Sequence, residues 1–280
     1  MLGTKLRRLI FSASAAAFTM IYSSAHAAST ISIGVDPTFA NALTDIVGAF
    51  QNYYVVNGNL TYNVVLTIDS SPNLESNIVN GGSSPPYDLF LSSNGLAPLD
   101  LFANHNSLVV GNPFPYAKDS LMLYSTLVDI SAGLPTSLTQ PFVIPDPTQD
   151  VFGLSAAEVL ATTPGALYAQ SHGYIQTRPD VGTTFAAADG GFFQYGFVAK
   201  SQICQYYGSA EHYVDGTYHH EYLYNDWRHP YLPIVLIGTK LARTRAADVE
   251  TELTNFVNFL TGVGATAGTD VIKQYCYKTP

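Results

Sequence analysis

The stretch that decides the fold, residues 31–50, reads ISIGVDPTFANALTDIVGAF. Its first five residues alternate as those of a half-buried strand do. Asp36 is a favoured helix N-cap and Pro37 suits a first helical turn, so an amphipathic helix is expected over Phe39 to Phe50. The stretch therefore predicts one strand–helix unit with a very short connection.

The same unit then repeats along the chain. Residues 62–68 form a second strand, and Asp69-Ser-Ser-Pro72 starts a second helix that runs to about Val79. A third strand is expected at Tyr87 to Leu91. Two strand–helix units followed by a third strand indicate a parallel α/β sheet.

The second half of the chain continues the alternation of strands and helices. Strands are expected at residues 120–124, 141–144, 195–199 and 231–237. Ser155-Ala-Ala-Glu158 matches a capping box and predicts a helix through Ala161. Further helices are expected at 181–188 and, with strong periodicity, at 246–260. A mature chain of about 250 residues is long for one core, so we expect two α/β lobes.

The N-terminus has the pattern of a secretory signal peptide. Lys5, Arg7 and Arg8 form a basic start, an uncharged apolar run follows, and Ala25-His-Ala27 fits the cleavage pattern. The alternative is a membrane anchor, but the apolar run is shorter than the ~20 residues that span a bilayer. Residues 1–27 are therefore expected to direct export to the periplasm and to be cleaved near Ala27.

The net charge of the mature chain limits the classes of partner that it can bind. Removal of the signal segment takes the formal net charge from −9 to −12, because that segment carries three basic residues and no acidic one. Binding of nucleic acid needs a basic surface, so no nucleic-acid partner is expected. The negative charge also disfavours long-range steering of an anionic ligand.

Cys204 and Cys276 are the two cysteines of the sequence. In an oxidising compartment such a pair favours one disulfide, which would close a large loop and tie the C-terminus to an internal segment. A metal-binding or redox pair is the alternative, although there is no CxxC spacing.

Small hydroxyl residues recur at the expected helix starts. They are Thr38, Ser70, Ser71, Ser155, Thr183 and Thr184. In open α/β sheets, ligands bind outside the carboxyl ends of the strands, where helix N-termini offer free backbone N–H groups. Several such ends in one cleft would bind a small oxyanion without Lys or Arg. Each hydroxyl taken alone is also explained as a helix cap.

The segment 205–229 breaks the pattern, because it is rich in Tyr and His, has no clean period and is expected to be an inserted loop or hairpin. Its histidines are His212, His219, His220 and His229. Imidazoles with nearby acids suit Zn or Cu, but these spacings match no compact zinc motif. The aromatic cluster could also serve as a protein interface. The sequence has no GxSxG, no Walker loop and no GxGxxG in the right context, so no catalytic residue is expected.

The order of these segments resembles the periplasmic molybdate-binding proteins of ABC importers. The likeness covers nearly all of the mature chain apart from the Tyr/His-rich segment. It is carried, in chain order, by Thr38–Leu43, Ser71–Ile78, Tyr87–Ser93, Tyr116–Leu123, Phe142–Pro147, Ser155–Leu160, Pro230–Leu236 and Phe256–Leu260. No single motif is specific, whereas their order and spacing together are.

The resemblance implies a type II periplasmic binding-protein fold, with two lobes that are each a mostly parallel sheet flanked by helices. Lobe 1 would comprise residues 28–113 and 230–280, and lobe 2 residues 114–229, with hinge crossings near 112–116 and 225–232. The lobes would close over a small oxyanion such as molybdate or tungstate and dock on a permease in the inner membrane. The resemblance implies no cofactor and no catalysis.

In this family the oxyanion contacts come from hydroxyls and backbone N–H groups. By resemblance, Thr38 and Ser71 would supply the two hydroxyls, and Ala156 and Val181 would supply backbone N–H groups of lobe 2. The ligand tyrosine of the family falls on Ala199, so that contact is missing. Tyr195 could replace it from another position.

Asp36, beside Thr38, leaves the nature of the ligand open. A carboxylate that faces the cleft would repel a bound dianion and would favour a cationic, zwitterionic or hydroxyl-rich organic solute. A carboxylate that only caps its helix would leave the oxyanion site intact. A metal ion or metal complex, with the Tyr/His-rich segment contributing, is a further alternative on the same fold.

Overall fold

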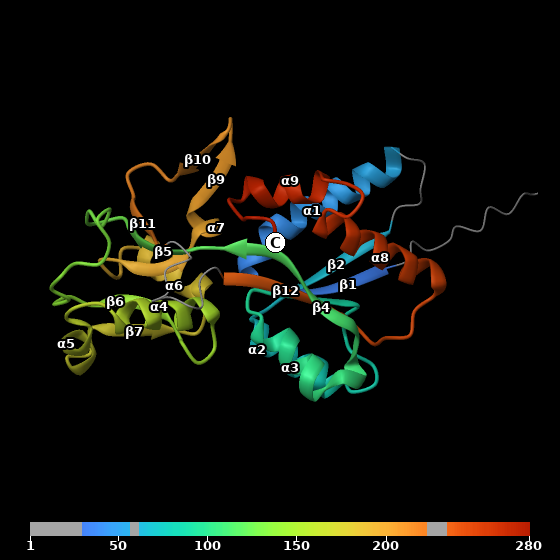
Figure 1. Ribbon diagram of the computed structural model, residues 1–280, viewed down its shortest axis with the longest axis horizontal. Coiled ribbons are helices and arrows are strands. Elements are labelled where there is room, and N and C mark those ends of the chain that lie inside the picture. The colour runs from blue at the N-terminus through green and yellow to red at the C-terminus, as the bar shows by residue number, and fades with distance from the viewer. Residues whose placement is uncertain (1–29, 57–61, 223–233) are drawn as a thin grey trace, which may run out of the picture.

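The computed structural model describes residues 30–56, 62–222 and 234–280, which form two α/β lobes lying side by side (Figure 1). Each lobe is built on a five-stranded sheet. The two-lobed α/β architecture expected from the sequence is therefore confirmed. The expected signal peptide, residues 1–27, lies outside the described residues. In the described part of the chain, no helix is both long and apolar enough to cross a membrane.

Lobe 1 contains the first strand–helix units. Its sheet has the order β2-β1-β3-β12-β4. The strands are β1 (Thr30–Val35), β2 (Asn63–Ile68), β3 (Leu89–Ser92), β4 (Val109–Asp119) and β12 (Ile234–Leu241). Strands β2, β1 and β3 are parallel, whereas β12 runs antiparallel to both β3 and β4. The sheet is thus mixed, because the strands that lead to and from lobe 2 are added to a parallel set.

Two groups of helices cover the two faces of the lobe 1 sheet. Successive side chains of β3 point alternately into the one group and the other. Leu89 and Leu91 share a core with α1 (Pro37–Val56), α8 (Ala247–Thr261) and α9 (Ala267–Gln274). Phe90, between them, points to the other face and joins the side chains of α2 (Ser71–Gly81) and α3 (Leu96–Asn104), which a short 3-10 helix, η1 (Asn106–Leu108), follows. A buried strand presents successive side chains to opposite faces, so both faces need a helical cover.

Lobe 2 repeats this plan with the strand order β11-β5-β8-β6-β7. Its strands are β5 (Leu121–Ser125), β6 (Phe142–Pro145), β7 (Ile175–Arg178), β8 (Gly196–Ala199) and β11 (Tyr218–Tyr222). Its helices are α4 (Val151–Ala161), α5 (Ala166–Ser171), α6 (Val181–Asp189) and the short α7 (Lys200–Ile203). Strands β8, β6 and β7 are parallel, and β5 runs antiparallel to both of its neighbours, β8 and β11, so this sheet is also mixed.

The lobes are joined where β4 of one sheet leads into β5 of the other, with only Ser120 between them. The expected crossing at 112–116 falls within β4, because pairing with β12 continues to Asp119. The second expected crossing, at 225–232, lies outside the described residues. The C-terminus lies near the join (Figure 1), where the backbones of Lys118 and Lys278 exchange hydrogen bonds of 2.8 and 2.9 Å.

A disulfide reinforces this join. Cys204, which follows α7 of lobe 2, is bonded to Cys276, which follows α9 of lobe 1, across 72 residues of sequence. The predicted bridge is therefore confirmed. It connects the lobes covalently beside the strand crossing.

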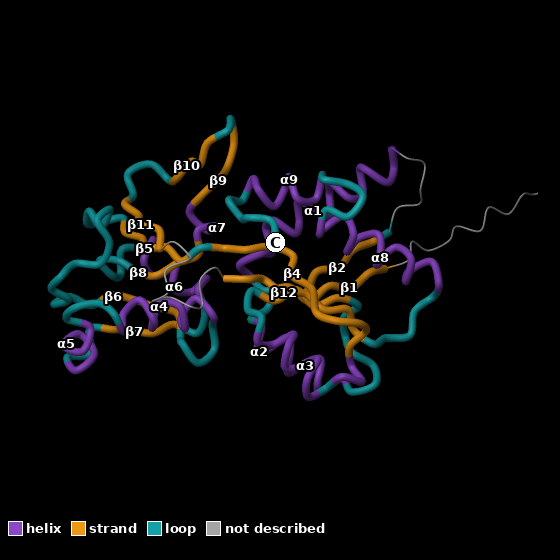
Figure 2. The backbone as a smooth tube through the Cα atoms, in the orientation of Figure 1, coloured by secondary structure: helices purple, strands orange, loops and turns teal. Residues whose placement is uncertain are grey.

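Part of the Tyr/His-rich segment forms the predicted hairpin. Strands β9 (Cys204–Tyr207) and β10 (Ala210–Tyr213) pair antiparallel and stand out from lobe 2 (Figure 2). Gly208 and Ser209 both have positive φ, +58° and +70°, as a two-residue type I′ turn requires. The chain then returns as β11, which extends the main sheet of lobe 2.

Candidate functional site

Four helices begin at the cleft between the lobes, α1 and α2 from lobe 1 and α4 and α6 from lobe 2. Residues of the first turn of α1 and α2, and the N-cap residues of α4 and α6, line a cavity of about 390 Å³. Each of these helices follows a strand of its sheet, so the carboxyl edges of both sheets face the cleft. This is where open α/β sheets bind ligands, and the cavity is therefore the candidate binding site.

Asp36 occupies the start of α1 and accepts four hydrogen bonds. Its Oδ1 accepts from the backbone N–H of Thr38 at 3.1 Å and from the Thr38 hydroxyl at 2.7 Å. Its Oδ2 accepts from the backbone N–H of Ser71 at 3.2 Å and from the Ser71 hydroxyl at 2.7 Å. The carboxylate thus caps its own helix, lines the cavity and joins the two hydroxyl residues that the resemblance assigned to the ligand.

The Ser71 hydroxyl belongs to a longer buried chain of hydrogen bonds. It accepts from the Ser92 hydroxyl at 2.8 Å while it donates to Asp36. The Ser92 hydroxyl in turn accepts from the backbone N–H of Asn94 at 3.1 Å. The Asn94 side chain accepts from the N–H of Ala97 at 3.0 Å, in the first turn of α3. The hydroxyl of Ser71 is therefore already used both as donor and as acceptor.

Asp150 lies at the start of a helix in lobe 2, as Asp36 does in lobe 1. Its Oδ1 accepts from the N–H of Phe152 at 2.7 Å in α4, and its Oδ2 accepts from the N–H of Val181 at 2.8 Å in α6. One carboxylate therefore occupies the N-termini of two helices. Burial raises the pKa of Asp150 to about 7, and the negative charge of Asp36 adds to the rise, whereas the two N–H donors oppose it.

Two more carboxylates sit at these helix starts. Asp69 accepts from the N–H of Ser70 at 2.7 Å and from the side-chain amide of Asn73 at 2.9 Å. Asp180 accepts from the N–H of Thr183 at 2.7 Å as the N-cap of α6. Both line the same cavity as Asp36 and Asp150. Among the described residues that line it, none is Lys, Arg or His.

The predicted capping box at Ser155 is wrong. Helix α4 begins at Val151 with Asp150 as its N-cap, and the Ser155 hydroxyl donates back to the carbonyl of Val151 within the helix. Ala156 is buried more than one turn inside α4, where backbone N–H groups bond within the helix. The first-turn donor of α4 at the cleft is instead Phe152.

Tyr195 and Ala199 lie in the core of lobe 2. The Tyr195 ring is 2 % exposed and stacks on Phe142 with ring centroids 5.2 Å apart. Ala199 is fully buried at the end of β8. Neither residue lines the 390 Å³ cavity. Of the residues expected at the ligand, Asp36 and Ser71 line this cavity. Thr38 and Val181 do not line it, but they donate to Asp36 and to Asp150, which do.

The described histidines of the insertion make separate contacts. His212 stacks on Tyr207, His219 stacks on Tyr213, and His220 Nδ1 lies 2.9 Å from the carbonyl of Ser131. His229 lies outside the described residues. Within the described part of the chain, no three His, Cys, Asp or Glu side chains are grouped as a metal site.

Sequence reasoning missed Asp150, although a local signal was present. Asp150 stands directly before an apolar run, which is the position of an N-cap. Its second partner, Val181, is 31 residues away and no local pattern points to it. The pairing of Asp36 with Ser71, across 35 residues, is hidden for the same reason.

Solved structures share this fold at low sequence identity. The periplasmic molybdate-binding protein of Azotobacter vinelandii matches with a TM-score of 0.69 and 21% identity, over 89% of this chain and 99% of that protein. Iron-bound HitA from Pseudomonas aeruginosa matches with a TM-score of 0.60 and 14% identity, over 88% of this chain and 84% of that protein. These likenesses show the fold alone.

The sequence itself gives the family. No curated protein sequence matches this chain. A family model described as bacterial extracellular solute-binding protein matches residues 31–267, which include both lobes and the whole candidate site. The chain therefore belongs to the bacterial extracellular solute-binding protein family.

Proposed function

We propose that this protein is the periplasmic solute-binding component of an ABC-type importer, and that its cleft takes a small cationic solute. The family membership and the two-lobed fold support the first part. In this scheme residues 1–27 direct export, the lobes close over the solute, and the closed form docks on a permease in the inner membrane. Closure needs a solute that binds the closed state more tightly than the open one.

The charge of the solute is inferred from one observation: the helix N-termini at the cleft already hold carboxylates. An oxyanion would need the hydroxyls of Thr38 and Ser71 and the N–H of Val181. In this chain all three donate to Asp36 or Asp150. The protein thus supplies its own anions at the positions that a bound oxyanion would occupy.

Electrostatics oppose a second anion in the same place. Two unit charges 4 Å apart interact by about 4 kcal/mol at an effective dielectric constant of 20. A dianion would be repelled by Asp36, and by Asp150 whenever that carboxyl is ionised, whereas a cation would gain the same interactions as attraction. Both carboxylates keep lone pairs that can accept further hydrogen bonds from an ammonium group or bind a cation.

The molybdate function implied by the family resemblance is the competing hypothesis. It needs Asp36 to turn away or to become protonated, and the proton that Asp150 partly holds near pH 7 to stay in place, when the oxyanion binds. The fold itself leaves the sign of the charge open, since a molybdate-binding protein and an iron-bound protein both share it. The four carboxylates of the cavity support a cation as the solute.

Isothermal titration calorimetry of the mature protein tests this proposal. Divalent metal ions, ammonium compounds, molybdate, tungstate, sulfate and phosphate are titrated separately. We expect binding only among the cations, and Asp36→Asn should weaken it at least tenfold by removing one attractive charge. Asp270→Asn, which removes an exposed carboxylate on α9, is the matched control and should bind as the wild type does. Binding of oxyanions alone would refute the proposal.

A further inference from the structure

A second cavity, of about 450 Å³, adjoins the carboxylate-lined one. Pro37 lines both, so they lie on either side of the first turn of α1. The second cavity is bounded by Thr38 and Asn41 of α1, by Phe185 of α6 and by the β9–β10 hairpin. The Tyr/His-rich insertion thus supplies one wall of a cavity that continues the inter-lobe cleft.

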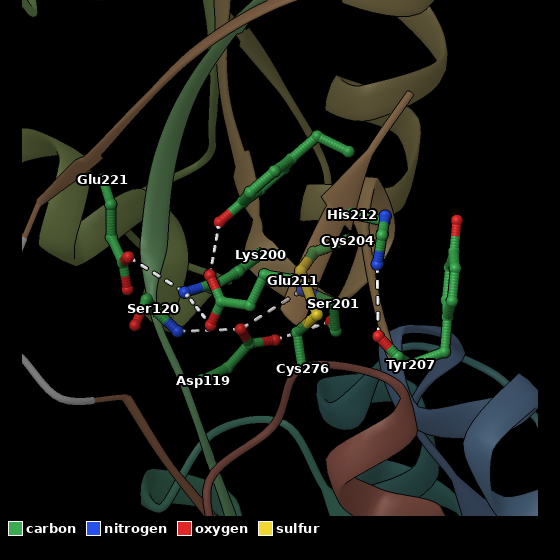
Figure 3. The surroundings of a disulfide bond; sticks show 11 residues. Asp119, Ser120, Lys200, Ser201, Cys204, Tyr207, Glu211, His212, Glu221 and Cys276 are labelled. Carbon is green, nitrogen blue, oxygen red and sulfur yellow. Dashed lines mark hydrogen bonds and ion pairs between the residues drawn. A yellow bond between two sulfur atoms is a disulfide. The ribbon is translucent and has the colours of Figure 1, made fainter. Parts of the chain in front are cut away.

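That wall is aromatic. The rings of Tyr207 and His212 stack face to face, with centroids 3.6 Å apart and planes inclined by 7°. The Nε2 of His212 also lies 3.1 Å from the backbone carbonyl of Tyr207, which fixes the pair side by side on the hairpin (Figure 3). Tyr213 from the hairpin and Tyr275 from the end of α9 add two further rings to the lining.

Two of these tyrosines donate their hydroxyl to a carboxylate. Tyr213 donates to Glu211 at 2.8 Å, and Tyr275 donates to Asp45 at 2.7 Å. Burial, and then the carboxylate partner, raise the pKa of each hydroxyl to about 12, so both remain neutral phenols. A phenol that donates to an anion gains electron density in its ring, which strengthens the negative face that attracts cations.

The charged groups around the cavity also favour a cation. No Lys or Arg is found among the described residues that line it. The nearby ammonium of Lys200 is buried and forms ion pairs with both Glu211 and Glu221, at 2.8 and 2.9 Å (Figure 3). This ammonium is thus neutralised by its two carboxylates and is not free to attract an anion. The aromatic cavity is therefore open to a cation and unfavourable to an anion.

We propose that the solute is an organic cation whose alkyl-substituted ammonium group occupies the aromatic cavity. This inference rests on the cationic solute of the proposed function. The ring faces attract the positive charge while the alkyl substituents bury apolar surface against them. A bare metal ion would use neither the rings nor the volume. The carboxylates across Pro37 add the long-range attraction.

Calorimetry with choline and tetramethylammonium as probes tests this inference. Both should bind to the mature protein. The neutral isostere of choline, 3,3-dimethyl-1-butanol, has the same shape without the charge and should bind at least tenfold more weakly. Equal binding of choline and its isostere would overturn the inference, because the cavity would then select for shape alone.

Variants of one ring give the second arm of the test. Tyr207→Leu keeps apolar volume and loses the ring, so choline affinity should fall by roughly threefold to thirtyfold. Tyr207→Phe keeps the ring and should retain binding. Tyr206→Leu changes the adjacent tyrosine on the opposite face of β9 and is the matched control. Unchanged affinity in Tyr207→Leu would also refute the inference.

The failure of this inference differs from the failure of the proposed function. Binding of divalent metal ions, but of neither ammonium probe, overturns the organic-cation inference and leaves the cationic cleft standing. Binding of oxyanions alone overturns both.

Discussion

The buried carboxyl of Asp150 makes the pH dependence of stability a direct test of the cleft. Its pKa is raised from 3.8 to about 7, first by burial and second by the charge of Asp36. A folded pKa above the unfolded one means that the folded protein prefers the protonated acid. The stabilisation is therefore present at low pH and is lost as the pH rises through about 7.

The magnitude follows from the two pKa values. Between pH 8 and pH 5 the folded carboxyl takes up a proton that the unfolded one does not, which adds about 3 kcal/mol to the free energy of unfolding. Asp150→Asn removes this proton uptake. The side chain is only 9 % exposed, so solvent screening reduces the effect little.

Urea denaturation of the wild type and of Asp150→Asn at pH 5 and pH 8 measures this difference. Burial also raises the pKa of Asp119 to about 6 and that of Glu75 to about 7, but these groups titrate in both proteins and cancel in the comparison. We expect the wild type to gain about 3 kcal/mol more than the variant on acidification. The same gain in both proteins would refute the placement of Asp150 beside Asp36 in a buried site.

Three further predictions concern residues that hold the structure around the site together. Replacing Cys204 and Cys276 by Ala opens a 72-residue loop and should cost about 4 kcal/mol of unfolding free energy; an unchanged urea midpoint would contradict this. Lys200→Met leaves two glutamates without their cation and should raise hydrogen exchange in residues 205–222 well above that in lobe 1. Gly153→Ala would place a Cβ 2.5 Å from the carbonyl oxygen of Pro145, so α4 should shift and the melting temperature should fall. Gly48→Ala, inside α1 with nothing within 4 Å, should leave the melting temperature unchanged or raise it slightly.

The local elements could be predicted wherever neighbouring residues determine them. Val35-Asp-Pro37 ends a strand, caps a helix and suits its first turn, and α1 begins at Pro37 as this order indicates. The two cysteines could be paired because the sequence predicts export to an oxidising compartment and two cysteines allow a single pairing. The lack of a period in the Tyr/His-rich segment indicates a loop or hairpin, which residues 204–213 form, but it does not reveal that β11 joins the sheet of lobe 2.

The site itself depends on contacts between distant residues, which the sequence does not display. Ser155-Ala-Ala-Glu158 looks like a capping box, but the same letters fit the middle of a helix, and Asp150 is the cap in the fold. The sequence also left Asp36 as either a cap or a cleft residue. It is both, because its second oxygen reaches Ser71 in the next strand–helix unit.

The direction of proton exchange on binding tests the central claim most directly. Near pH 7 Asp150 is partly protonated, because its pKa is about 7. A cation in the cleft favours the ionised carboxylate and releases protons, whereas an oxyanion favours the acid and takes protons up. Calorimetry in two buffers of different ionisation enthalpy gives this sign for whichever of choline, divalent cations and molybdate binds most tightly. We predict proton release; proton uptake on binding of molybdate would contradict a cationic solute.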